Sequence, residues 1–196
     1  RRTIEKMHFV MGTEGVPYDH NDRFVYGVLD IILSGGMSSR LFQEVREKRG
    51  LVYDIGTENV HYRDTGIFSL SASTRPANFE EVLKVTAAEL KKIKEGQVSE
   101  DEITRVKNQL RASIAMSLES VSSRMMKIAR SEIYYGRDIP DEEIMEMVRD
   151  VAIDDIVRIA NEIFSSDRFM FTTLGPMPEG DGDRITNGFN EIIRTL

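Results

Sequence analysis

Few residues in this chain could perform chemistry on their own. His8, His20 and His61 are its three imidazoles, and it has no cysteine. Zinc hydrolases bring neutral imidazoles and a carboxylate together around an open coordination position, often with two histidines on consecutive helical turns. No two histidines here are four residues apart, and His8 and His61 fall in strand-like runs. The sequence therefore predicts no metal site and no cofactor within the chain itself.

Each histidine also fits a simpler structural role. His20 stands before a helical pattern, where it suits an N-terminal capping turn. His61 suits a surface position on a strand. For His8, both a half-buried strand position and a functional role stay open.

The acidic and serine-rich clusters favour structure over catalysis. Residues 80–81, 100–102 and 141–143 are acidic and fall in the first turns of predicted helices, where a carboxylate faces the positive end of the helix dipole. The stretch 34–38 lacks the Gly-x-Ser-x-Gly pattern of a nucleophile elbow, and no Lys-Ser or Lys-Thr follows it as in a phosphate-binding loop. The residues alone therefore favour a binding or supporting role.

The composition is that of an ordinary globular protein. Of the 196 residues, 40% are hydrophobic and 30% are charged. The net charge of -7 argues against a nucleic-acid binder, which needs a basic face. No apolar run approaches the roughly 18 residues that cross a bilayer, so no membrane span is expected. Because there is no cysteine, the redox compartment cannot be inferred, and a cytoplasmic location is the default expectation.

Hydrophobic patterning predicts the elements that must position any site. Ile67 to Thr74 alternates apolar and small polar residues, and Asp64-Thr65-Gly66 supplies turn chemistry after the strand-like run from Leu51 to Tyr62. These runs predict a β-hairpin. Further strands are expected at Met7 to Gly12 and at Arg168 to Leu174. Helices are expected between residues 22 and 34 and between 39 and 50, and then at 79–95, 99–116, 119–135, 141–148 and 154–164. The run Ser99-Glu100-Asp101-Glu102 predicts a capping box at the start of the helix over 99–116.

This order of elements predicts an α+β fold, a mostly antiparallel sheet with helices packed on one face. We expect one domain over residues 1–175. Residues 176–196 begin glycine-rich and acidic and continue with apolar residues at helical spacing. They are interpreted as a linker or a C-terminal helical extension.

One segment carries a family resemblance. Residues 33–53 read LSGGMSSRLFQEVREKRGLVY and closely resemble a segment of the pitrilysin-type, or inverzincin, zinc metallopeptidases, which include insulin-degrading enzyme and the mitochondrial processing peptidase. The resemblance extends over about residues 5 to 175. In that family the first of two homologous domains carries an HxxEH zinc motif, and the second carries an Arg and a Tyr that contact bound peptide. Because this chain has no HxxEH, it is similar to the second, zinc-free domain.

The resemblance implies the roles of two residues. Arg46 and Tyr53 fall at the family's spacing, which implies that both bind substrate and that Tyr53 is the catalytic oxyanion donor. It also implies a zinc ion held by an HxxEH-bearing homologous domain, in the same polypeptide or in a partner chain. An extended peptide would lie between the two domains, and a homodimer is also compatible. The parent protein would then be a zinc endopeptidase, whereas this chain alone would not be an enzyme.

The residue types suit these roles. Peptide hydrolysis develops negative charge on the carbonyl oxygen, and a positioned phenol can stabilise that charge selectively in the transition state. The guanidinium of Arg46 offers a planar fork of donors for peptide carbonyls or acidic side chains. Spacing alone favours a simpler interpretation, in which Arg46 is a solvated cation at a helix end and Tyr53 an ordinary strand aromatic, and the resemblance reverses that preference. Two other functions stay open: a catalytically inactive structural member of the family, and a stand-alone peptide-binding or oligomerisation module.

Overall fold

The fold is built on a four-stranded antiparallel sheet. The computed structural model describes residues 4–165, 167–176 and 180–196. The strands are β1 (Met7–Gly15), β2 (Val52–His61), β3 (Gly66–Thr74) and β4 (Met170–Leu174), in the spatial order β2-β3-β1-β4. The predicted hairpin is the pair β2–β3, and β1 lies between β3 and β4. Strands β2 and β4 are therefore the two edges of the sheet.

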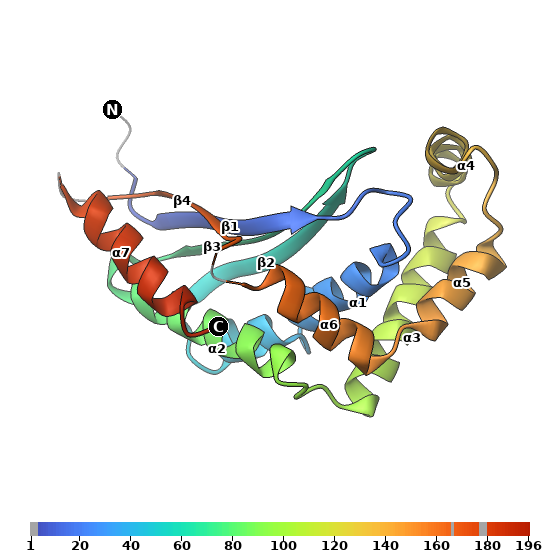
Figure 1. The fold of residues 1–196 in the computed structure, drawn as a ribbon. Helices are drawn as coiled ribbons and strands as arrows, with labels where there is room; N and C mark the ends of the chain where they lie inside the picture. The colour runs from blue at the N-terminus through green and yellow to red at the C-terminus, as the bar shows by residue number, and fades with distance from the viewer. Residues whose placement is uncertain (1–3, 166, 177–179) are drawn as a thin grey trace.

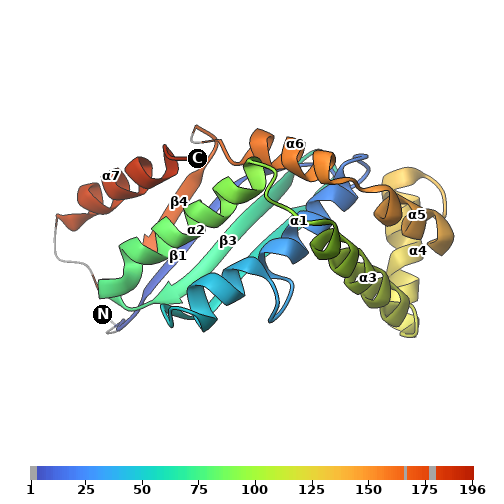
Figure 2. The same cartoon turned by 90° about the horizontal axis from the view of Figure 1, so that it is seen from below.

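Helices lie on one side of this sheet and beyond one of its ends. They are α1 (Arg23–Ser34), η1 (Phe42–Glu47), η2 (Pro76–Asn78), α2 (Phe79–Lys94), α3 (Glu100–Ser117), α4 (Val121–Tyr135), α5 (Asp141–Asp150), α6 (Ile153–Ile163) and α7 (Asp181–Ile193). Figure 1 shows α1, α2, α6 and α7 below the sheet, with α3, α4 and α5 gathered at one end. Figure 2, seen from the helical side, shows α7 at the opposite end. The predicted α+β architecture is confirmed.

The strand alternation explains why the helices lie on one side. Along β1, Met7, Phe9 and Met11 are buried, whereas His8 and Val10 are exposed. The buried side chains pack against the apolar faces of α1, α2 and α6 in one continuous core. Because successive side chains of a strand point to opposite faces, one face of the sheet must be covered and the other can remain open.

The segment after β4 ends in a helix that joins this core. Phe189, Ile192 and Ile193 of α7 are buried, and the ring of Phe189 stacks on that of Phe171 with centroids 4.2 Å apart. The boundary between a domain at 1–175 and a C-terminal extension stays a prediction. None of the helices in the described part of the chain combines the length and apolar character that crossing a bilayer requires.

The start of α3 differs from its predicted cap in an informative way. The side chain of Ser99 accepts a hydrogen bond from the backbone N–H of Glu102, as a capping box predicts. The carboxylate of Glu102, however, does not return to Ser99. It accepts two hydrogen bonds from Arg40, at 2.9 and 2.6 Å, and Arg40 also donates to the carbonyl of Gln97. This largely buried ion pair joins the segment before η1 to α3.

A chain of hydroxyl groups ties α1 to the edge strand β2. The backbone N–H of Thr57 donates to Ser34 Oγ at 2.8 Å, the Ser34 and Thr57 hydroxyls lie 2.6 Å apart, and Thr57 Oγ1 donates to Asp30 Oδ1. Burial, with a smaller contribution from the charge of Glu58, raises the pKa of Asp30 to about 6, although the bond from Thr57 opposes the shift. Folding therefore favours the neutral carboxyl of Asp30 relative to the unfolded chain.

We predict that Asp30 makes the protein less stable as the pH rises from about 4 to about 6. An unfolded Asp titrates near pH 3.9, so the folded state binds more protons above that pH and loses stability until Asp30 ionises. Asp30→Asn should abolish this loss, which amounts to about 3 kcal/mol for a shift from 3.8 to about 6. Urea unfolding of both proteins from pH 3 to 7.5 measures the difference. Parallel stability curves would contradict the prediction.

Candidate functional site

The first predicted site residue, Arg46, lies on a short π-helix. The backbone N–H of Lys48 donates to the carbonyl of Gln43, five residues earlier, at 2.9 Å. Val45 is fully buried and holds η1 against the core. Gly50, with φ +61°, ends the segment in the left-handed conformation that glycine adopts without strain. Short π-helical turns often occur at functional sites, because they change the direction of the side chains that follow.

The charged end of η1 is organised around one carboxylate. Glu44 accepts hydrogen bonds from Lys48 at 2.5 Å and from Arg49 at 2.6 Å, and these bonds lower the pKa of Glu44 to about 2. Arg49 also donates to the backbone carbonyl of Glu44. Of the three cations in this segment, Lys48 and Arg49 are therefore paired with Glu44. Arg46 is the third.

The second predicted site residue, Tyr53, lies at a β-bulge. Val52 pairs with Thr74 and Asp54 with the preceding residue, Ser73, so Tyr53 is an extra residue on β2 with no partner on β3. A bulge bends the strand and redirects the side chain that it carries. The side chain of Tyr53 is 76% exposed, in contrast to Val52 before it and Ile55 two residues after it, which are buried.

The structure brings Arg46 and Tyr53 together. The guanidinium carbon of Arg46 lies 4.6 Å from the ring centroid of Phe42 and 5.3 Å from that of Tyr53. Within the described part of the chain, that guanidinium forms no hydrogen bond or ion pair. Contact with the two rings holds the guanidinium in one orientation. Each such cation–π contact stabilises by about 0.5–1 kcal/mol at an exposed site. Its N–H donors remain available to a ligand.

A further cation beside Tyr53 was not predicted from the sequence. The Nζ atom of Lys6 lies 6.0 Å from the Tyr53 ring centroid. Lys6, Tyr53, Arg75 and Asn78 line a shallow cavity of about 310 Å³ at the sheet edge. Lys6 reaches this place because β1 and β2 both pair with β3. A local pattern cannot indicate this contact, since it depends on strand order.

The glycine loop before η1 forms a tight turn. Gly36 has φ +144°, and its carbonyl accepts hydrogen bonds from both the backbone N–H and the hydroxyl of Ser39. Gln109 of α3 donates to the carbonyl of Gly35. The side chain of Met37 is 75% exposed at the tip. The loop is thus braced by α3 and presents Met37 outward.

The three histidines lie apart and have separate surroundings. His8 is exposed on the uncovered face of β1, and His20 accepts a hydrogen bond from the backbone N–H of Asp22 at 3.1 Å, as expected for a capping turn. The prediction that His61 is a surface residue is wrong. His61 is half-buried, its Nδ1 lies 2.8 Å from the carbonyl of Val16, and burial lowers its pKa. Among the described residues, no cluster of three or more His, Asp or Glu side chains could hold a metal.

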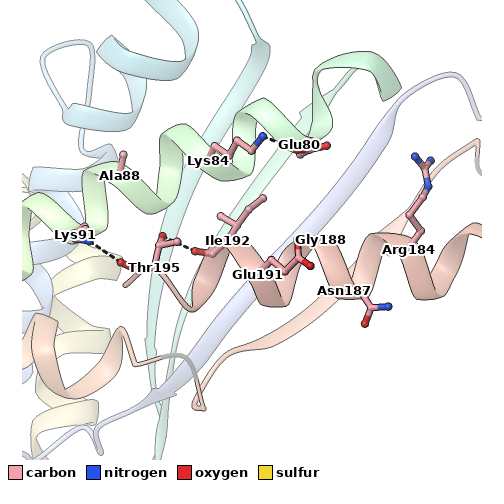
Figure 3. A pocket seen from close by; sticks show the side chains of 10 residues that line it. All are labelled: Glu80, Lys84, Ala88, Lys91, Arg184, Asn187, Gly188, Glu191, Ile192 and Thr195. Atoms are coloured by element: carbon pink, nitrogen blue, oxygen red, sulfur yellow. Dashed lines mark hydrogen bonds and ion pairs between the residues drawn. The ribbon is translucent and has the colours of Figure 1, made fainter.

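A larger cavity, of about 1000 Å³, lies between α2 and α7 and contains neither predicted site residue. Figure 3 shows that its two lysines are paired, one within α2 and one with the backbone just after α7. Lys84 pairs with Glu80 at 2.6 Å, and Lys91 donates to the carbonyl of Thr195 at 2.9 Å.

The fold and site define an α+β domain in which a half-buried Arg46 lies beside an exposed Tyr53 at a sheet edge. The chain belongs to the family described as Peptidase M16 inactive domain, whose sequence profile matches residues 1–110. A protein of Rickettsia felis, described as an uncharacterized zinc protease, is 41% identical over 166 residues, which are 84% of this chain and 40% of the relative. A Streptomyces coelicolor protein with the same description is 34% identical over 94% of this chain and 40% of its own length.

This chain thus spans about two fifths of the length of those relatives. Solved structures share its fold. A Helicobacter pylori protease superposes with a TM-score of 0.77 at 24% identity, over 88% of this chain and 42% of that one. A chain of Complex III2 from Candida albicans superposes with a TM-score of 0.81 at 17% identity, over 98% of this chain and 48% of that one.

We predict that the isolated chain binds no stoichiometric zinc. Its imidazoles lie apart, and a structural or catalytic zinc requires three or four converging ligands. Dialysis against zinc followed by elemental analysis checks this, with the triple variant His8→Ala, His20→Ala, His61→Ala as the baseline. One tightly held zinc per chain that the triple variant loses would contradict the prediction.

Proposed function

We propose that this chain is the substrate-binding half of a zinc-dependent endopeptidase. It would contact an extended peptide and the developing oxyanion opposite a separate HxxEH zinc domain, and it would not cleave peptide alone. The observation that carries the proposal is the pairing of Arg46 with an exposed Tyr53 at a bulge of an edge strand. Family membership and relatives described as zinc proteases support it.

The edge strand supplies a place for the peptide backbone. Along β2, one side is bonded to β3 and the other side pairs with no described strand. An extended peptide can add to such an edge through main-chain hydrogen bonds, with side-chain selectivity supplied by the residues around it. Tyr53 and Arg46 lie at the beginning of this edge.

Tyr53 and Arg46 would then act on different parts of the substrate. The zinc of the partner domain would supply Lewis-acid activation of the attacking water. The Tyr53 hydroxyl would donate a hydrogen bond to the carbonyl oxygen as negative charge develops there. Arg46 would hold a neighbouring carbonyl or carboxylate with two of its N–H groups and so fix the register of the peptide.

The alternatives differ in what they require of Tyr53. A catalytically inactive structural member of the family is one alternative, and the similarity in fold to a chain of Complex III2 is compatible with it. A stand-alone peptide-binding or oligomerisation module is the other. Neither requires a phenol exposed beside a guanidinium, because a scaffold stabilises no oxyanion. A cytoplasmic location is proposed only as the default compartment.

We predict that Tyr53→Phe in the assembled peptidase lowers kcat about 100-fold and changes KM little, because it removes a donor that acts in the transition state. Steady-state cleavage of an extended fluorogenic peptide measures both constants. Tyr62→Phe is the matched control, since Tyr62 is 48% exposed just beyond the other end of β2. An unchanged kcat for Tyr53→Phe would refute the oxyanion role.

We predict that Arg46→Ala raises KM about tenfold or more, because it removes charge-assisted hydrogen bonds made in the ground state as well as in the transition state. Arg46→Lys should restore only part of the affinity, since an ammonium lacks the planar fork. Arg49→Ala, which removes a cation already paired with Glu44, is the control. Equal KM values for all three variants would exclude substrate binding by Arg46.

A further inference from the structure

Helix α4 is attached to the rest of the domain by its polar side and its last turn. The ring of Tyr134 stacks on that of Tyr18 with centroids 4.2 Å apart, and the Tyr135 hydroxyl donates to the carbonyl of Tyr18 at 2.9 Å. Ser131 is the buried residue of α4, and Lys127 pairs with Asp141 of α5. Both ribbon views place α4 at the end of the molecule remote from α7.

The opposite side of α4 is apolar and exposed. Five large apolar side chains of this helix are exposed to between 45% and 85%: Val121, Met125, Met126, Ile128 and Ile133. Met116, near the end of α3, adds a sixth at 64%. We name these six residues the α4 face.

This arrangement reverses the usual amphipathic pattern. A helix on the surface of a globular domain turns its apolar stripe to the core and its charges to water, whereas α4 turns Ser131 and Lys127 inward. Contiguous exposed apolar patches of this kind mark interaction sites in folded proteins. Methionines suit such a surface, because their flexible side chains adapt to the shape of a partner.

We infer that the α4 face is a docking surface for the homologous domain that accounts for much of the remaining length of the relatives. This rests on the two-domain arrangement proposed above. The relatives are about two and a half times as long as the part that this chain matches, since it covers 40% of each. The part of each relative that lies outside the match is long enough to contain a second domain that covers this apolar helix face.

Charge and residue type favour this partner over a second copy of the chain and over a membrane surface. Lys127 is paired with Asp141, which leaves Arg124 and Arg130 against one carboxylate of α4, Glu132. A second copy of α4 packed on the first would bring these cations together, whereas a different domain can place acidic residues around an apolar patch. Helices that lie on membranes usually insert Trp, Phe or Leu. The α4 face has none of these, and the tyrosines of α4 contact Tyr18 instead.

Methionine oxidation tests the inference without relying on peptidase activity. The isolated chain and the assembled two-domain protein are exposed to hydrogen peroxide, and sulfoxide at Met116, Met125 and Met126 is followed by peptide mass spectrometry. These side chains should oxidise on the order of tenfold more slowly in the assembly, because docking removes them from solvent. Equal rates in the two samples would overturn the inference, whether or not the assembly cleaves peptide.

Further samples distinguish the other occupants. Protection that grows with the concentration of the isolated chain would assign the face to a second copy, and protection by phosphatidylglycerol vesicles would assign it to a membrane. Either result would overturn the inference. Ile128→Lys should abolish protection in the assembly, whereas Ser123→Lys, on the same helix but outside the α4 face, should preserve it. Circular dichroism of both variants confirms that the domain remains folded.

Discussion

The structure depends on one constraint, which is that a four-stranded antiparallel sheet must bury one of its two faces. The alternation along β1 and β3 assigns Phe9, Met11, Phe68 and Leu70 to the inner face. Helices α1, α2 and α6 then cover these side chains. The outer face and the edge strand β2 are left open by the same arrangement. The surfaces available for binding are therefore consequences of how the core is built.

The proposed site is assembled at the place where this edge meets the helical layer. The Arg40–Glu102 ion pair holds the segment before η1 against α3, and the hydroxyl chain through Ser34 and Thr57 holds β2 against α1. Both connections are made by polar groups within packed surroundings. Removing one partner there lowers the stability of the fold by more than the intact pair contributes to it. They fix the two segments from which Arg46 and Tyr53 project.

Much of the fold could be predicted because it is encoded locally. The period of apolar residues, the turn at residues 64–66 and the serine cap of α3 indicated the hairpin and the long helices to within a few residues. The resemblance over residues 33–53 indicated Arg46 and Tyr53, which the structure brings together. What the sequence did not indicate depends on contacts between distant segments or on the arrangement of neighbouring strands. This group contains the bulge at Tyr53, the approach of Lys6 and the partial burial of His61. It also contains the pairing of Glu102 with Arg40 in place of Ser99.

Reconstitution tests the central claim most directly. The HxxEH domain is prepared as a separate chain, and its rate of cleavage of an extended peptide is measured as this 196-residue chain is added. If this chain is the substrate-binding half, the zinc domain alone should be nearly inactive, and the rate should rise with added chain and then saturate. A rate that does not change at any concentration of a correctly folded chain would contradict the account.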